Sequence, residues 1–260
     1  MEPPAWQCEG TLSPTVAVAL HAGHELRDEV AALMAIDEQH RLMEEDPHTD
    51  TWASLAGSRV KVFRSRFEVD LNRPREAAVY LEPDQAWGMA VWKRPPPAEI
   101  VDRSRCLHDA FYRMLEDLLE RTERTFGRFV VYDLHAYNHR RGGRAAPAAD
   151  PAENPDVNVG TGSMDRDRWA PVVERFMGDL RAAEVAGRAL DVRENVRFRG
   201  GYLCQWVHQR FPTAGCAVAI EVKKFFMDEH IGQVDAALLG SVGEALAATA
   251  AVVVEALGRS

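Results

Sequence analysis

The chain has 260 residues, of which 46% are hydrophobic and 27% are charged, and its formal net charge is −9. This length and composition are typical of a folded globular protein, and we expect a single α/β domain over residues 1–260. The acidic balance argues against nucleic acid or an anionic membrane surface as the main partner, because both bind basic surfaces.

Strand and helix signals alternate along the chain, which favours an α/β fold. Short β-branched or apolar runs predict strands at 15–20, 59–63, 67–71, 129–132 and 216–222. Apolar residues at helical spacing predict helices within 26–43, 104–124, 166–183, 201–211 and 234–257. Asp235, Glu244 and Glu255 interrupt the last run, so we interpret it as a packed helix and not as a membrane span.

Further features of the sequence concern access to a binding site and the cellular location of the protein. Residues 138–155 are dominated by Arg, Gly, Ala and Pro without periodicity, which predicts a mobile loop long enough to cover a site. The four cysteines are scattered without metal-binding spacing, and the N-terminus lacks the pattern of a secretory signal. We therefore expect reduced thiols and a cytoplasmic protein.

Residues suited to metal binding and proton transfer lie where apolar strands end. His21 follows TVAVAL, His135 follows VVYDL, and Glu221 lies within AIEV. Ligands bind at the carboxyl ends of strands in open α/β sheets, and imidazoles and carboxylates suit a catalytic zinc that keeps a position for water. Such a metal acidifies water and polarises a carbonyl, while a nearby carboxylate moves the proton.

Each of these residues also has a structural interpretation. A single histidine at a strand end is more often a hydrogen-bonded structural residue than a ligand. Glu221 differs, because a carboxylate inside an apolar strand needs a partner. Its structural alternative is an ion pair with Lys223 or Lys224. We favour the functional interpretation for Glu221.

The segment at 64–73, RSRFEVDLNR, gathers arginines and an amide around one short predicted strand. Arginine recognises a carboxylate through a planar, bidentate fork. Asn72 and Arg73 are adjacent, so both reach one ligand only if the strand ends there, which Pro74 favours. The alternative is a solvated loop of mixed charge.

The motifs HAG, SRFEVDLNR, YDLHAY, FRGG and AIEV, in this order, resemble those of N-formylglutamate amidohydrolases. The resemblance extends from about His21 to Glu221. It implies a mixed β-sheet flanked by helices on both faces, a phosphorylase/hydrolase-like fold akin to zinc carboxypeptidases and aspartoacylase-like amidohydrolases. The implied reaction converts N-formyl-L-glutamate to formate and L-glutamate in histidine catabolism.

The resemblance also implies a metal site for zinc or another divalent transition metal. His21 looks like the first ligand and His135 like the last. Asp46, which ends the acidic run EED, is the preferred middle ligand, with Glu25 and Glu45 as alternatives.

The remaining implied roles concern the substrate, a small anionic N-acyl amino acid. Arg66, Asn72 and Arg73 look like the groups that bind its carboxylate and orient its carbonyl, with Arg73 also assisting catalysis. Glu221 looks like the general base. The sequence departs from the family pattern in HELR after HAG, in the basic loop, and in NVGTGSMDRDRW, whose residues 160–162 we expect to line the site.

Two other functions compete with this one. The first is metal-dependent hydrolysis of a peptide or of an amino acid with a larger acyl group. The second is a non-catalytic binding protein, which we rank low because candidate metal ligands and the candidate base are all present.

Overall fold

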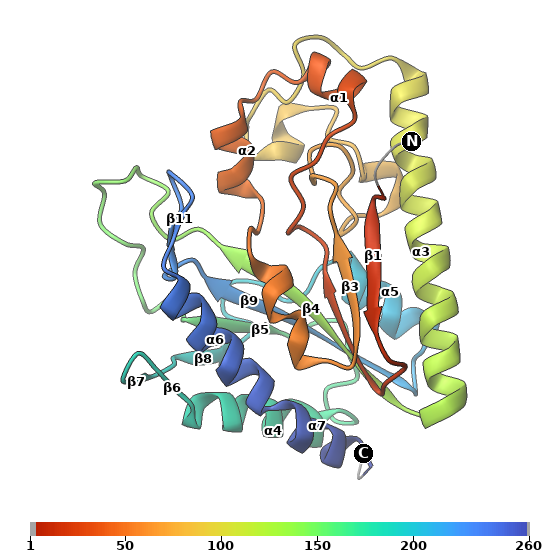
Figure 1. Ribbon diagram of the computed structural model, residues 1–260, viewed down its shortest axis with the longest axis vertical. Coiled ribbons are helices and arrows are strands. Elements are labelled where there is room, and N and C mark those ends of the chain that lie inside the picture. The colour runs from red at the N-terminus through yellow and green to blue at the C-terminus, as the bar shows by residue number, and fades with distance from the viewer. Residues whose placement is uncertain (1–3, 259–260) are drawn as a thin grey trace.

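The computed structural model describes residues 4–258. A mixed seven-stranded sheet in the order β1-β3-β2-β4-β9-β5-β8 forms its centre (Figure 1). Strands β3, β2, β4 and β9 are parallel, whereas β1 and β5 run antiparallel to their neighbours β3 and β9. The strands are β1 (Trp6–Gly10), β2 (Thr15–Ala19), β3 (Ser58–Val62), β4 (Phe129–Tyr137), β5 (Val157–Gly160), β8 (Val192–Glu194) and β9 (Gly215–Lys223).

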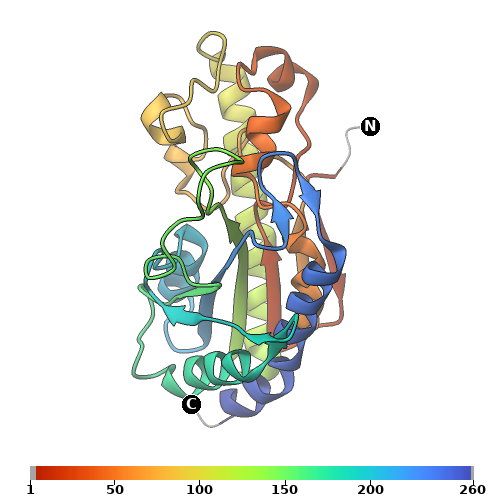
Figure 2. The same cartoon turned by 90° about the vertical axis from the view of Figure 1, so that its left-hand side faces the viewer.

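Helices cover both faces of this sheet, as expected for the predicted fold class (Figure 2). The helices α3 (Ala98–Phe126) and α5 (Tyr202–Arg210) pack on one face. The other face carries the 3-10 helix η1 (Thr49–Leu55) with α4 (Ala170–Ala182), α6 (Ala236–Ala248) and α7 (Ala250–Leu257).

Smaller elements gather around this core. They are α1 (Asp28–Leu33), α2 (Glu38–Glu44), η2 (Arg75–Ala77), η3 (Pro83–Ala86), and the two hairpins β6 (Glu184–Val185) with β7 (Arg188–Ala189) and β10 (Met227–Asp228) with β11 (Gln233–Val234). Both views place α1, α2 and the chain between β3 and α3 at one end of the molecule (Figures 1 and 2).

The continuous apolar runs form the buried centre of the sheet. Every residue of β2 and β4 is buried, because helices cover both faces of these parallel strands. Alternate residues face opposite layers: Val16 and Val18 pack toward α3 and α5, whereas Ala17 and Ala19 pack toward η1 and α6. The strands expected at 15–20, 59–63, 129–132 and 216–222 are confirmed.

Two expectations about local structure were wrong. Residues 67–71 form turns instead of a strand, with the backbone N–H groups of Glu68 and Val69 donating to the carbonyl of Ser65. The pattern misled because the charged residues of this segment are buried as well as the apolar ones. The expected helix within 26–43 is two short helices, because Met34 leaves the helix to pair with Trp92 and Asp37 caps a new helix.

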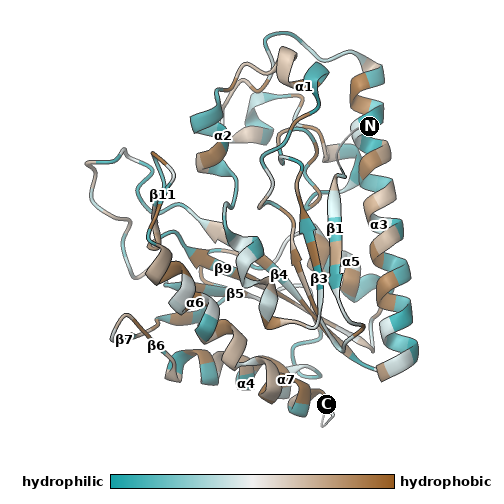
Figure 3. Cartoon of the chain, viewed as in Figure 1, coloured by the Kyte–Doolittle hydropathy of each residue, from teal (hydrophilic) through white to brown (hydrophobic). Residues whose placement is uncertain are grey.

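The apolar run near the C-terminus forms α6 and α7, which meet at Thr249. Residues Ala236–Leu257 are long and apolar enough to cross a membrane by length and composition, with a mean hydropathy of 1.8 over the most apolar part (Figure 3). Their buried residues pack against η1 and α4, and the Trp52 indole donates a hydrogen bond to the Leu239 carbonyl. The absence of a membrane partner stays a prediction.

Residues 138–155 contain no helix or strand, as predicted. The buried Glu229 carboxylate accepts the backbone N–H groups of His139 and Arg140, and Arg144 pairs with Asp228. The loop is therefore attached to the β10–β11 hairpin. Its mobility stays a prediction.

Candidate active site

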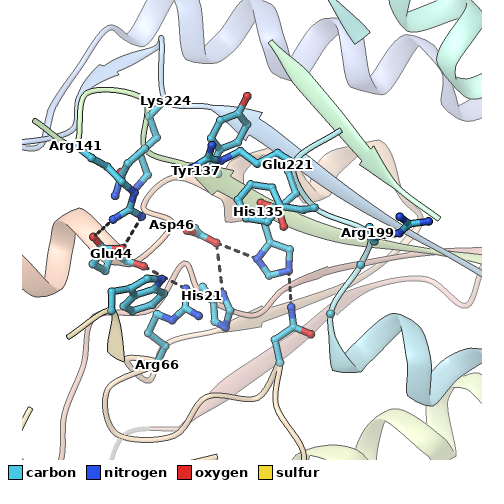
Figure 4. Close-up of a pocket in the computed structure, with 18 residues that line it drawn as sticks. His21, Glu44, Asp46, Arg66, His135, Tyr137, Arg141, Arg199, Glu221 and Lys224 are labelled. Atoms are coloured by element: carbon cyan, nitrogen blue, oxygen red, sulfur yellow. Dashed lines mark hydrogen bonds and ion pairs between the residues drawn. The ribbon is translucent and has the colours of Figure 1, made fainter. Parts of the chain in front are cut away.

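Three residues distant in sequence meet at the carboxyl end of the parallel strands (Figure 4). His21 follows β2, His135 lies in β4, and Asp46 follows α2. All three are buried, and one ligand atom from each lies within 4.8 Å of the others. Since β2 and β4 are parallel neighbours, their ends meet at the same edge of the sheet. The Asp46 backbone N–H donates to the His21 carbonyl over 2.9 Å, which brings the third residue to the strand ends.

A second layer of carboxylates orients the two imidazoles. His21 Nε2 lies 2.7 Å from Asp70 Oδ1, and His135 Nε2 lies 2.7 Å from Asp133 Oδ1. The opposite ring atoms, both Nδ1, lie 3.5 Å and 2.9 Å from the same Asp46 Oδ2. Among described atoms, the buried His21 Nδ1 has no hydrogen-bond partner. Metal-binding histidines characteristically place their second nitrogen on a carboxylate in this way.

The electrostatics of this cluster favour added positive charge. Burial raises the pKa of Asp46, but the hydrogen bond from His135 and the nearby His21 imidazole outweigh burial and hold this pKa well below its usual range. Burial lowers the pKa of His135, but the Asp133 and Glu221 carboxylates outweigh burial and raise this pKa well above its usual range. Two nitrogens, one carboxylate oxygen and surplus negative charge form a donor set that suits zinc or a similar divalent ion.

The two alternative acids lie outside this cluster. Glu25 is exposed, and its backbone N–H donates to the carbonyl of Phe63, which directly follows β3. Glu45 is buried, but its carboxylate accepts hydrogen bonds from Ser65 and His24. The structure therefore places Asp46 beside the two histidines, and metal binding itself stays a proposal.

Glu221 lies on β9 directly beside His135 on β4, and both line the same pocket. Neither lysine pairs with it: Lys223 Nζ lies 2.9 Å from Asp156, and Lys224 donates to backbone carbonyls. Within residues 4–258, no hydrogen bond or ion pair engages the Glu221 carboxylate.

The pKa of Glu221 reflects this position. Burial raises it to about 7, the Asp46 and Asp133 carboxylates act in the same direction, and the imidazoles of His135 and His21 oppose them. A carboxylate with a pKa near neutrality is suited to accept and return a proton.

Arg66 and Asn72 also line the pocket, whose volume is about 370 Å³. The Arg66 guanidinium donates to Asp70 over 3.0 Å and lies 4.9 Å from the centre of the Trp87 ring. The Asn72 carboxamide lies 3.2 Å from His135 Nε2, and its oxygen accepts the Leu203 backbone N–H over 2.9 Å.

Arg73 shares the Asp70 carboxylate with Arg66, at 3.4 Å, but its side chain lies behind the pocket wall. Its guanidinium lies 4.4 Å from the centre of the Tyr80 ring, donates to the Gln85 carbonyl over 2.7 Å, and does not line the pocket. Adjacent residues point in different directions here because 70–73 is a turn. Residues 160–162 do not line the pocket either. They support its wall instead, since the Gly162 N–H donates to the Arg199 carbonyl over 2.7 Å.

Sequence reasoning missed several residues of the pocket. Gly201 lies against Asn72, and a Cβ at this glycine would come within 2.3 Å of the Asn72 carboxamide nitrogen. Arg141, from the 138–155 loop, forms two hydrogen bonds of 2.8 and 3.0 Å with the buried Glu44. The FRGG motif and the basic composition of the loop were the available signals. The buried Lys224 had no such signal.

Comparison with known proteins gives one family and a set of similar folds. The model of a family described as N-formylglutamate amidohydrolase matches residues 13–227. No curated protein matches this chain.

Three solved structures illustrate the comparison. An N-formylglutamate amidohydrolase from Ralstonia eutropha JMP134 aligns with a TM-score of 0.77 at 16% identity, over 98% of each chain. A gene product from Agrobacterium tumefaciens aligns with a TM-score of 0.64 at 16% identity, over 99% of this chain and 94% of the other. A metallo-carboxypeptidase from Burkholderia cenocepacia gives a TM-score of 0.40 at 15% identity, over 96% of this chain and 60% of the other.

Proposed function

Because the chain belongs to the N-formylglutamate amidohydrolase family, and so is a hydrolase of linear amides, we propose that it cleaves small N-acyl amino acids with the help of a divalent metal ion. N-formyl-L-glutamate is the first candidate substrate, and zinc is the first candidate metal. The products would be formate and L-glutamate.

One observation carries this proposal: an unpaired carboxylate lies beside the candidate metal ligands. Glu221 is adjacent to His135 across the β4–β9 pair, lines the same pocket as His21 and Asp46, and forms no ion pair with its neighbouring lysines. Glu221 is partly exposed to the pocket and otherwise enclosed by the sheet. An unpaired carboxylate in such surroundings is unfavourable for folding, so its presence at this point favours a role in proton transfer.

The chain's own residues suggest how the reaction proceeds. His21, Asp46 and His135 would hold the metal, which when bound polarises a carbonyl and acidifies water. Glu221 would take a proton from the water that attacks the acyl carbon. It would then deliver that proton to the amide nitrogen as the C–N bond breaks, which releases the amine.

Two further residues support the reacting groups. The Arg66 guanidinium lines the pocket and can stabilise the negative charge that develops on the acyl oxygen. Asn72 can orient the substrate with its carboxamide, which the Leu203 N–H holds in place. We do not assign substrate contact to Arg73, whose guanidinium is engaged by Gln85 and lies over Tyr80.

The size of the pocket bears on the competing substrates. A volume of about 370 Å³ is near the lower end of the range for ligand pockets, which favours a small acyl group over a peptide.

We also propose a cytoplasmic location and a role in histidine catabolism. The free thiols of Cys8, Cys106, Cys204 and Cys216 are consistent with a reducing compartment.

The proposal is tested by measuring the metal content of the purified protein and by screening N-acyl amino acids for amine release. We expect about one zinc per chain, and faster release from N-formyl-L-glutamate than from N-acetyl or peptide analogues. If the zinc-loaded protein binds these compounds but cleaves none of them, the non-catalytic alternative is correct.

A further inference from the structure

Lys224 follows β9 and carries a buried ammonium into the wall of the pocket (Figure 4). Only 1% of the residue is exposed. Its Nζ donates to the carbonyl oxygens of Met43 and Glu45, each over 2.7 Å. These two carbonyls belong to the segment that leads into Asp46, so the ammonium is fixed close to the candidate metal ligands.

This buried cation has no paired anion. In the described part of the chain, no carboxylate forms an ion pair with Lys224, whereas the adjacent Lys223 pairs with Asp156 over 2.9 Å. Glu44 is near Lys224 but is held by two hydrogen bonds from Arg141. Burying an ammonium without a counter-ion is unfavourable unless a ligand supplies the missing charge.

The hydrogen-bonding capacity of the ammonium also indicates that a ligand binds to it. A lysine ammonium has three N–H donors, and two of them are used by the carbonyls. Burial lowers the pKa of Lys224, and the carboxylates of Asp46, Glu44 and Glu229 oppose burial. A third acceptor that carries negative charge would therefore complete the environment of this side chain.

The two arginines expected to bind the substrate's carboxylate are placed for other contacts, Arg66 for the acyl oxygen and Arg73 for the Tyr80 ring and Gln85. Arg66 donates to Asp70 and to the Tyr80 hydroxyl, and Arg73 lies outside the pocket. Lys224 is the buried cation of the pocket wall that retains a donor.

We propose that Lys224 determines specificity by binding a carboxylate of the substrate with its ammonium. This inference rests on the proposed hydrolysis of N-acyl amino acids. It names the residue that would select an anionic substrate over a neutral one of the same shape.

The test compares acid and amide substrates of the same shape. The zinc-loaded wild type and Lys224→Gln are assayed with N-formyl-L-glutamate, N-formyl-L-glutamine and N-formyl-L-isoglutamine, in which one carboxylate or the other is an amide. Glutamine keeps N–H donors for the two carbonyls and removes the charge. Lys223→Gln is the matched control, because it removes the neighbouring lysine whose ion pair lies outside the pocket.

We expect the wild type to prefer the acid over one of the two amides, and Lys224→Gln to lower kcat/KM for the acid by at least roughly 30-fold, as for removal of one partner from a buried charge pair. The variant should hydrolyse the disfavoured amide nearly as fast as the wild type does. The ratio of kcat/KM for the acid to kcat/KM for this amide should therefore fall sharply. The amide that shows this change identifies the carboxylate. A ratio that is unchanged in Lys224→Gln overturns the proposal, because a purely structural role would slow all substrates equally.

Two further measurements separate the possible failures. If Lys224→Gln does not fold, Lys224→Met replaces it. If neither folds, equal wild-type rates on the acid and both amides overturn the proposal, and a strong preference for the acid supports it. If the wild type hydrolyses none of the three, the proposed function fails. Calorimetric binding of glutarate then decides: weaker binding to the Lys224 variant supports the carboxylate site, and equal binding overturns it.

Discussion

Replacing Glu221 with glutamine should lower activity and raise stability at the same time. The substitution keeps the shape of the side chain and removes its ability to accept a proton. Loss of a general base typically lowers the rate by about 10²–10⁴-fold, so we expect kcat to fall by at least roughly a hundredfold. The variant should still bind zinc, since His21, Asp46 and His135 are unchanged.

The expected gain in stability comes from the pKa of Glu221. Burial raises this pKa from 4.5 in the unfolded chain to about 7 in the fold. The folded state therefore binds the proton more tightly, and stability is lost as pH rises from 4.5 to 7. Each pKa unit corresponds to about 1.4 kcal/mol, so ionised Glu221 destabilises the metal-free fold by up to roughly 3 kcal/mol above pH 7. Glutamine carries no charge, and its variant avoids this loss.

Urea unfolding of the metal-free proteins at pH 8, together with amine-release kinetics of the zinc-loaded proteins, measures both effects. Glu68→Gln is the matched control. Glu68 is fully buried, but it pairs with Arg27 over 2.8 Å and lies outside the pocket, so its loss should reduce stability and spare kcat. If Glu221→Gln is destabilised like the control, Glu221 has a structural partner. If it folds and keeps full activity, the proposed mechanism is wrong.

Three other changes test the remaining parts of the site and the fold. His21→Ala should abolish both zinc binding and activity, and a variant that elemental analysis finds as metal-loaded as the wild type would refute the ligand assignment. Arg73→Lys should lower the melting temperature, because the side chain loses its contacts with Tyr80 and Gln85, and it should change kcat/KM only a few-fold. A large loss of turnover at an unchanged melting temperature would instead support the carboxylate role that the family resemblance implies. Burial lowers the pKa of His208 from 6.5 to about 4. The unfolded chain therefore takes up the proton first as pH falls, and unfolding free energy should drop by up to roughly 3 kcal/mol between pH 6.5 and pH 4. His208→Gln should remove this part of the pH dependence, and identical pH profiles of the variant and the wild type would contradict the assignment.

The centre of the sheet could be predicted from the sequence because its residues are buried on both faces. The run before His135 and the run around Glu221 are continuously apolar, which identifies them as central strands whatever their neighbours are. Since such strands are parallel neighbours, the polar residues at their ends meet. The positions of His21, His135 and Glu221 in one pocket follow from this rule.

Other features depend on contacts that a local pattern does not contain. The segment 67–71 alternates apolar and charged residues like a surface strand, yet Glu68 and Asp70 are fully buried because Arg27 and Arg66 pair with them. The direction of Arg73 depends on a turn and on the ring of Tyr80. Arg27 is 41 residues from Glu68 in the sequence, so this contact does not appear in a local pattern. Arg66 is only four residues from Asp70, but that spacing alone does not show that both side chains are buried.

The opposite charges of Glu221 and Lys224 show how the fold prepares this pocket. They lie three residues apart, and a direct ion pair would neutralise both. The carbonyls of Met43 and Glu45 hold the ammonium instead, while the sheet holds the carboxylate beside His135. Two separated charges in one buried site oppose folding, but they need no rearrangement when a substrate arrives. The same two carbonyl contacts fix the segment before Asp46, so a single lysine couples the proposed carboxylate site to the proposed metal site.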